Sequence, residues 1–471
     1  MTHRLLCLVA LALVGCGPAE TRAQATDTAP APATKPGDRL AASDLLGSWR
    51  GAYIQNRGTL SVDMDIRSDG DGGLLAVQRV PDWIGYAPMQ PAPIVLGPDG
   101  SVEIPDALRG GLRLQFDPVY RQLVGETGTG LSAHFKRALP PLPSRVMAEE
   151  VRIPAGDVSL AGTLTRPDGP GPHPAMVVIS GRGCWGRGRS IGRVLPEYGM
   201  AVLEYDKRGT GDSTGACDRA TFDDLVDDAV AAMEYLRAQP GIDPARVGLQ
   251  GGSAGAWTAQ GVAGRALDDP DLDLPAFIVT FIGPATSIEM QQRESGEAIA
   301  DQLGLDAPSR AAVMRSVDIT LDRSLPNEAV FEELAAIAAA AEAAGWKNQM
   351  FDPSDIPASP EAVDALWLRR FVFDPTPILR RLTDTPYLSL LGAEDAIVPL
   401  PSNADALRDA LDAAGNTAYA VVVIPGTGHG VEHGDREATL PDGATYTKFD
   451  TVEPLYFTAM IDFLREQGVL D

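Results

Sequence analysis

The segment Gly251-Gly252-Ser253-Ala254-Gly255 is the part of this sequence that decides the fold. It follows a short apolar run, Val247-Gly248-Leu249, and a stretch compatible with a helix begins at Ala256. A Gly-x-Ser-x-Gly motif between a strand and a helix is typical of a nucleophile elbow, a turn so tight that bulky neighbours of the serine would clash. The motif also occurs by chance in a chain with 49 glycines, so its interpretation depends on a matching base and acid.

Histidine is the base that such a serine most often uses, and the chain contains five histidines. Three of them lie upstream of Ser253. We expect His429 to be the base, because it follows a predicted strand at 418–424 and a Pro-Gly-Thr-Gly loop. His433 is the reserve candidate. The two could together bind a metal ion, but no helical pattern or second carboxylate cluster accompanies them, so we expect no metal site.

The acid that orients the base is predicted at the end of another strand. Residues 385–391 have the pattern of a buried strand, and residues 392–399 follow it as a loop. Asp395 is placed where a carboxylate leaving the sheet can accept the imidazole N–H. Glu394 is the competing candidate, although its side chain would point elsewhere if Asp395 points inward.

Together these motifs resemble the α/β-hydrolase superfamily. Gly-x-Ser-x-Gly, Gly-x-x-Asp-x-x-Val-Pro and Gly-His-Gly occur in the family's order, and the segments 201–213, 221–224 and 242–249 also match its pattern. The narrower resemblance is to a branch that contains bacterial carboxylesterases, dienelactone-hydrolase-like enzymes, prolyl-oligopeptidase-like peptidases and acyl-CoA thioesterases. It covers about residues 148–471. It implies a mostly parallel sheet flanked by helices, with Ser253, Asp395 and His429 as catalytic residues.

Hydrophobic patterns independently indicate an α/β fold. Residues 175–179 are a continuous apolar run, as expected for a strand buried on both faces of a parallel sheet. Residues 221–238 have apolar positions at three- and four-residue steps, and Thr221 can cap the helix that they predict. Alternation of strands and helices implies a parallel sheet.

The resemblance also implies two backbone donors for the oxyanion, Ala254 and a residue in the loop after Ser180. By position the second donor is Arg182, with Gly183 as the alternative. This loop differs from related esterases, where small and acidic residues are usual. Its side chains Trp185 and Arg187 are candidates for substrate binding. Four arginines (182, 187, 189 and 193) could bind an anionic group of the substrate, but pairing with the many carboxylates of the chain is the favoured interpretation.

Two cysteines in this region form a predicted disulfide. Cys184 and Cys217 both fall in loops after strands that should be neighbours, and outside the cytoplasm such a pair favours a bridge. The alternative is two free thiols, because sequence cannot show that the Cα atoms come within bridging distance.

The N-terminus indicates export. Residues 1–15 contain a short basic region and an apolar stretch too short to span a bilayer, as in a signal peptide. Leu13-Val14-Gly15-Cys16 resembles a bacterial lipobox, which would make Cys16 a lipidated residue anchored in the cell envelope; the alternative is an ordinary cleaved signal. Gly17 favours the outer membrane. Residues 16–41, rich in Ala, Thr and Pro, are predicted to be a flexible tether.

Between the tether and the hydrolase region, residues 42–140 have short alternating segments and turns. This pattern predicts a small antiparallel β domain, a sandwich or half-barrel, that shapes the active-site entrance, binds a polymer or acts as a spacer. Asp69 and Asp71 only faintly resemble a calcium loop, and a hairpin turn explains them better.

A second insertion interrupts the strand and helix alternation at about residues 285–380, where alanine-rich and helical segments predict a cap. Its aromatic residues could line a substrate pocket or stabilise the cap itself, the latter being expected for most of them. They are Trp346, Phe351, Trp367 and Phe371.

The composition limits the classes of partner and cofactor that we expect. A net charge of −25 argues against nucleic acid, and no phosphate loop, thiolate cluster or dinucleotide motif indicates a cofactor. The resemblance implies cofactor-free acyl transfer to water, and a small-molecule carboxylic ester is the leading substrate class. A peptidase or acyl-CoA thioesterase that uses the same residues is the second interpretation. The third is a binding lipoprotein with a vestigial site.

Overall fold

The structure, a computed structural model, describes residues 40–55, 58–80, 89–108, 110–117, 121–138, 146–187, 191–351, 353–430, 437–439, 445–447 and 454–471. The described residues belong to a single unit, residues 40–471. The predicted signal peptide, the predicted lipidation site Cys16 and nearly all of the predicted tether lie outside the described residues, as does His433.

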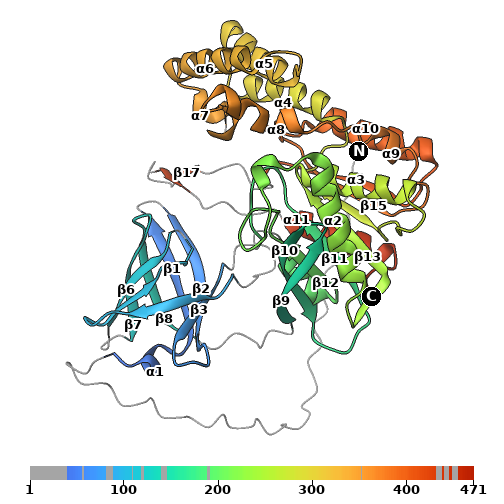
Figure 1. Cartoon of the computed structure of the whole chain (residues 1–471). Coiled ribbons are helices and arrows are strands. Elements are labelled where there is room, and N and C mark those ends of the chain that lie inside the picture. Colours follow the sequence, from blue (N-terminus) through green and yellow to red (C-terminus); the bar gives the residue numbers. More distant parts are fainter. Residues whose placement is uncertain are drawn as a thin grey trace, which may run out of the picture. The chain divides into compact units, whose positions relative to one another are not determined.

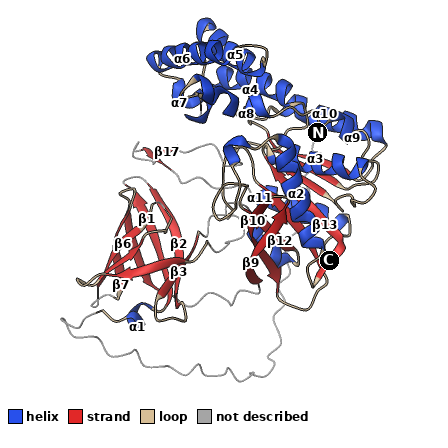
Figure 2. Cartoon of the chain, in the orientation of Figure 1, coloured by secondary structure: helices blue, strands red, loops and turns tan. Residues whose placement is uncertain are grey.

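The N-terminal part of the described chain is a closed antiparallel barrel (Figures 1 and 2). A short helix, α1 (Ala42–Leu45), precedes it. Strand β1 pairs with β2 on one side and with β8 on the other, which closes the barrel. The eight strands are β1 (Gly47–Gln55), β2 (Gly58–Ser68), β3 (Leu74–Arg79), β4 (Ala92–Leu96), β5 (Ser101–Ile104), β6 (Leu112–Asp117), β7 (Gln122–Thr127) and β8 (Ser132–Arg137).

This closure corrects the expectation of a sandwich or half-barrel. Large side chains fill the barrel, among them the fully buried Trp49, Tyr53 and Phe135. The buried amide of Gln78 is satisfied there, because it donates to the hydroxyl of Tyr53 (2.5 Å) and accepts from the backbone N–H of Leu108 (2.9 Å). Such a filled interior is typical of small eight-stranded barrels.

The turn between β2 and β3 explains the aspartates that faintly resembled a calcium loop. Oδ1 of Asp69 accepts the backbone N–H groups of Asp71 and Gly73, each at 2.8 Å. The carboxylate therefore stabilises a hairpin turn. No cluster of three or more metal-ligating side chains occurs within the described ranges.

The remaining chain forms an eight-stranded sheet in the order β16-β15-β14-β13-β11-β12-β10-β9. Six neighbouring strands run parallel to one another: β16, β15, β14, β13, β11 and β12. At the edge beyond β12, β10 pairs antiparallel with β12, and β9 pairs antiparallel with β10. The bounds are β9 (Val146–Ala155), β10 (Val158–Pro167), β11 (His173–Ile179), β12 (Ala201–Tyr205), β13 (Ile242–Gly252), β14 (Ile278–Phe281), β15 (Tyr387–Gly392) and β16 (Tyr419–Ile424).

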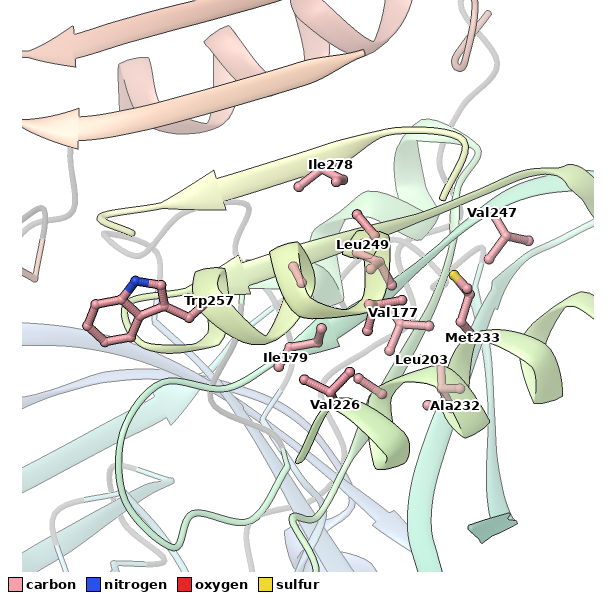
Figure 3. Close-up of a cluster of buried hydrophobic side chains, with 14 of the residues drawn as sticks. Val177, Ile179, Leu203, Val226, Ala232, Met233, Val247, Leu249, Trp257 and Ile278 are labelled. Carbon is pink, nitrogen blue, oxygen red and sulfur yellow. The ribbon is translucent and has the colours of Figure 1, made fainter. Parts of the chain in front are cut away.

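Helices cover both faces of this sheet. Successive side chains of a strand point to opposite faces, so each strand contributes to two separate cores. Val177 of β11 joins a core with α2 (Phe222–Arg237), α3 (Gly255–Asp268) and α10 (Leu400–Ala414). Figure 3 shows part of this core, with Trp257 of α3 at one end. The neighbouring Met176 and Val178 join the opposite core, which contains α11 (Pro454–Glu466) and Leu195 of the 3₁₀ helix η2 (Ile191–Tyr198).

The start of α2 confirms the predicted cap. The hydroxyl of Thr221 accepts the N–H of Asp224 (3.2 Å), and Asp224 accepts the N–H of Thr221 (2.8 Å). This reciprocal pair satisfies two backbone donors at the helix N-terminus.

Between β14 and β15 the chain inserts a series of helices, which Figure 1 shows in yellow and orange. The insertion has small apolar cores of its own, one around Leu334 and one around Trp346. Its elements are α4 (Ile288–Gln302), α5 (Ala307–Leu321), α6 (Asn327–Ala344), α7 (Lys347–Met350), η4 (Pro353–Asp355), η5 (Pro360–Ala365), α8 (Trp367–Arg370) and α9 (Thr376–Leu379).

Two smaller features complete the description. A short 3₁₀ helix, η3 (Cys217–Arg219), precedes α2, and β17 (Glu437–Thr439) pairs with β18 (Thr445–Thr447) near the C-terminus. Within the described part of the chain, every helix is too short or too polar to cross a membrane.

Candidate active site

Ser253 lies at the turn from β13 into α3, and its φ of +50° places it in the left-handed region that few non-glycine residues adopt. The turn is crowded on both sides. A Cβ added at Gly251 would lie 2.4 Å from the carbonyl oxygen of Gly255, and one at Gly255 would lie 2.4 Å from that of Ile179. Gly252 is different, because the nearest atom to an added Cβ is 4.0 Å away. The crowding of this turn therefore falls on Gly251 and Gly255 rather than on Gly252.

Ser253, His429 and Asp395 form a continuous hydrogen-bonded relay. Oγ of Ser253 is 3.0 Å from Nε2 of His429, and Nδ1 of His429 is 2.9 Å from Oδ2 of Asp395. These three residues follow β13, β16 and β15, whose carboxyl ends share one edge of the sheet. The parallel arrangement is thus what brings together residues that are far apart in sequence.

The carboxylate of Asp395 is buried and held on both oxygens. Its side chain is 1% exposed, and its second oxygen, Oδ1, accepts the backbone N–H groups of Ile397 (2.8 Å) and Val398 (2.9 Å). This arrangement leaves Oδ2 for the imidazole. Glu394, the competing candidate, is exposed to solvent.

The loop after β11 lies against the serine. A Cβ added at Gly181 would be 3.0 Å from Cβ of Ser253 and 3.6 Å from its Oγ. Within the described residues, the backbone N–H groups of Arg182 and Ala254 have no hydrogen-bond acceptor, as expected for donors that await an oxyanion. The same is true of Gly183, so this alternative stays open.

A disulfide ties this loop to the start of the α2 region. Cys184 and Cys217 are bonded to each other, with their Cα atoms 5.8 Å apart. The loop therefore has a covalent link to η3 as well as its connection to β11.

The arginines of the loop pair with carboxylates, as the favoured interpretation of the sequence held. The guanidinium of Arg187 binds Asp206 and Glu150 and donates to the hydroxyl of Thr163 (2.9 Å), so it is not available as an anion clamp. Arg182 forms an ion pair with Asp355 of the helical insertion. Arg189 and the side chain of Arg193 lie outside the described residues.

Two neighbouring cavities lie beside the nucleophile turn and share part of their lining. One, of about 510 Å³, contains Ser253 and is lined by Ile299, Phe351 and several amide and hydroxyl side chains. The other, of about 590 Å³, is more aromatic and is lined by Phe222 and Phe371. Residues that line both form the boundary between them: Arg182, Ala254, Trp257, Leu366 and Trp367.

The boundary is built around Arg182. Its guanidinium carbon lies 5.0 Å from the centre of the Trp367 ring, a distance typical of a cation–π contact. Trp185, a predicted substrate contact, is 45% exposed and lines the larger cavity. Trp346, in contrast, is buried and donates to the hydroxyl of Ser309 (3.1 Å), so it stabilises the insertion and lines neither of these two cavities.

Comparison with known proteins agrees with this geometry. The sequence pattern of the family described as serine aminopeptidase, S33, matches residues 171–436, more than half of the chain. The chain belongs to this family. Membership of S33 makes the protein a serine hydrolase with the α/β-hydrolase fold.

Individual relatives of this S33 protein are distant. An uncharacterized protein of Mycobacterium tuberculosis is 37% identical over 94 residues, which are 20% of this chain and 32% of the relative, so the match spans about a third of that protein. A proline iminopeptidase-related protein of Thermus thermophilus is 22% identical, with a TM-score of 0.41 over 69% of this chain and all (100%) of the other. Carboxyl esterase 2 of the fungus Tuber melanosporum is 16% identical, with a TM-score of 0.41 over 71% and 89%.

Proposed function

We propose that the protein is a carboxylester hydrolase that works through an acyl-enzyme on Ser253. The hydrogen-bonded relay from Ser253 through His429 to Asp395 carries this proposal. Oγ of Ser253 attacks the ester carbonyl carbon while Nε2 of His429 takes the hydroxyl proton, and Asp395 orients the imidazole and stabilises its charged form.

The second half of the reaction uses the same groups. The imidazolium of His429 returns its proton to the leaving alkoxide, the carbonyl carbon to alkoxide bond breaks, and an acyl-enzyme remains on Ser253. A water molecule then attacks the acyl carbon with His429 as base, which releases the acid and restores the serine. The backbone N–H groups of Ala254 and Arg182 stabilise both tetrahedral intermediates.

The cavity that contains Ser253 supports an ester rather than an amino-terminal peptide as substrate. An aminopeptidase needs an acidic group to bind the α-ammonium of its substrate. Among the described residues that line this cavity the carboxylate is Asp355, and its partner is Arg182. The rest of the lining is apolar or carries neutral amides and hydroxyls, for example Gln292 and Thr320.

The family favours a second candidate, an aminopeptidase on the same relay. A thioesterase would use the same relay too. The leaving group that the enzyme accepts distinguishes an aminopeptidase or a thioesterase from an esterase.

The test is hydrolysis of p-nitrophenyl esters from acetate to decanoate by the full chain, by Ser253→Ala and by Ser132→Ala, an exposed serine of the barrel that serves as matched control. The proposal expects turnover that Ser253→Ala loses and Ser132→Ala keeps. Aminoacyl p-nitroanilides and acyl-CoA substrates form the second panel. Faster Ser253-dependent cleavage of either of these would reject the ester assignment.

The helical insertion is proposed to act as a cap that selects substrates, because its residues Phe351 and Trp367 line the cavities.

We further propose that the chain is a lipoprotein of the bacterial cell envelope, anchored through Cys16 at the outer membrane. The lipobox-like sequence before Cys16 supports this. In a bacterial host, the wild type should partition into the detergent phase of a Triton X-114 extract, and Cys16→Ser should move to the aqueous phase. Equal partition of both proteins would reject the anchor.

A further inference from the structure

Lys207 is a buried cation that the proposed mechanism leaves without a role. It follows β12 and is 7% exposed. Its Nζ donates to the backbone carbonyl oxygens of Gly181 and, at 3.1 Å, Gly183. Among the described residues no carboxylate forms an ion pair with it. Burial of an ammonium group without a carboxylate partner costs free energy, so this lysine is an unusual feature against the loop after β11.

The bond to Gly181 acts on the peptide that carries a proposed oxyanion donor. The carbonyl of Gly181 and the N–H of Arg182 belong to one planar trans peptide and point in opposite directions. Lys207 on the carbonyl side therefore fixes the plane of this peptide and directs the N–H of Arg182 away from itself. Ser253 is close by, since a Cβ at Gly181 would lie 3.0 Å from its Cβ.

We propose that Lys207 is a positioning residue for the hydrolase reaction: its ammonium group holds the Gly181–Arg182 peptide so that the N–H of Arg182 remains directed to the oxyanion. The inference rests on the proposed function of Ser253. A hydrogen bond from a charged donor is about twice as strong as a neutral one, and it also polarises the N–H at the far end of the same peptide. Lys207 thus makes Arg182 both a better oriented and a stronger donor.

A neighbouring contact provides an internal comparison. Nε1 of Trp185 donates to the carbonyl oxygen of Arg182 at 2.5 Å, and this carbonyl shares its peptide with the N–H of Gly183. Lys207 therefore holds the peptide of one candidate donor, and Trp185 holds the peptide of the other. Substitution of each residue separates the two assignments.

The charge of Lys207 gives the proposal a pH dependence. Burial and, to a smaller extent, the positive charge of Arg370 on α8 together lower the pKa of Lys207 to about 8. Asp218 of η3 and Arg182 line the same cavity, while the neighbouring Asp206 is paired with Arg187. Because the ammonium loses its proton as the pH rises through about 8, kcat of the wild type should decrease there.

The experiment measures kcat and KM of the full chain on its best p-nitrophenyl ester between pH 6.5 and 10. The variants are Lys207→Met and, as matched control, Lys136→Met at an exposed barrel position. We expect Lys207→Met to lower kcat about 10- to 100-fold, less than the 10²- to 10³-fold loss on removal of an oxyanion donor, with KM changed less than about twofold. Its kcat should lack the decrease above pH 8, and Lys136→Met should match the wild type.

Lys207→Gln retains a donor without the charge, and it covers the case in which Lys207→Met does not fold. The kcat of Lys207→Gln should be lower than that of the wild type and should not decrease above pH 8. A wild-type kcat and pH profile in this variant, or in Lys207→Met, overturns the inference. So does a larger kcat loss in Trp185→Phe than in Lys207→Met, because it assigns the donor to Gly183. A wild type no faster than Ser253→Ala overturns the proposed function itself, and the inference with it.

Discussion

Alanine substitutions within the nucleophile elbow should have opposite outcomes at adjacent positions. At Gly251 an added Cβ lies 2.7 Å from Cα of Ala256, whereas carbon atoms are in favourable contact at about 3.5–4.0 Å. The methyl group therefore overlaps backbone by about 1 Å, and no side-chain rotation can relieve it. We expect Gly251→Ala to lower the free energy of unfolding by about 3 kcal/mol, at the upper end of typical overpacking costs. At Gly252 the atoms nearest to an added Cβ are 4.0 Å away, so Gly252→Ala should change the free energy of unfolding by less than about 0.5 kcal/mol.

The catalytic activity of Gly251→Ala and Gly252→Ala should differ in the same way as their stability. Relief of the overlap in Gly251→Ala moves the turn that holds Ser253, and a displacement of about 1 Å can cost about 100-fold in rate. Gly252→Ala should retain kcat within about threefold of the wild type, since its backbone has no reason to move. Urea unfolding and ester turnover of both variants measure these effects. An unfolding free energy for Gly252→Ala as low as that for Gly251→Ala would refute the steric reasoning.

Three further predictions concern the residues around the elbow. Asp395→Asn should lower kcat about 10⁴-fold with little change in fold, because the amide favours the wrong imidazole tautomer; a loss below tenfold in turnover assays would contradict this role. Reduction of the Cys184–Cys217 disulfide, which closes a loop with a sequence separation of 33, should lower the free energy of unfolding by about 3–4 kcal/mol in denaturation with and without reductant. The folded chain releases the proton of Lys207 at about pH 8 and the unfolded chain only near 10.5. The unfolded state therefore binds more protons between these values, and the stability of the wild type should rise with pH by up to about 3 kcal/mol relative to Lys207→Met. A flat difference between the two unfolding curves would contradict the burial of a charged lysine.

The relay could be predicted from sequence because each member follows a recognisable strand. Ser253, Asp395 and His429 all lie in loops after apolar runs, and parallel strands bring such loops to one edge. The alternation of apolar residues in the N-terminal region likewise predicted antiparallel strands.

What escaped prediction depends on contacts between distant residues. Closure of the barrel needs β1 to pair with β8, as in the pair Trp49 and Arg137, and alternation within a strand contains no information about its partner. Lys207 stands between Asp206 and Arg208 in a turn, a pattern typical of a solvated segment, and only the packing of the loop above it reveals its burial. The space beside Gly252 is also a property of tertiary packing.

The sequence distance between the relay residues has a consequence for when activity can arise. Ser253 and His429 are 176 positions apart, so their contact must wait until the helical insertion, β15 and β16 have been synthesised and have joined the sheet. Contacts between residues so far apart in the sequence form late, because the entropy cost of closing a long loop must be overcome first. A nascent chain that has not yet reached β16 and His429 therefore has no assembled relay. Any reaction that depends on this relay therefore requires a chain in which β16 and His429 are already present and folded.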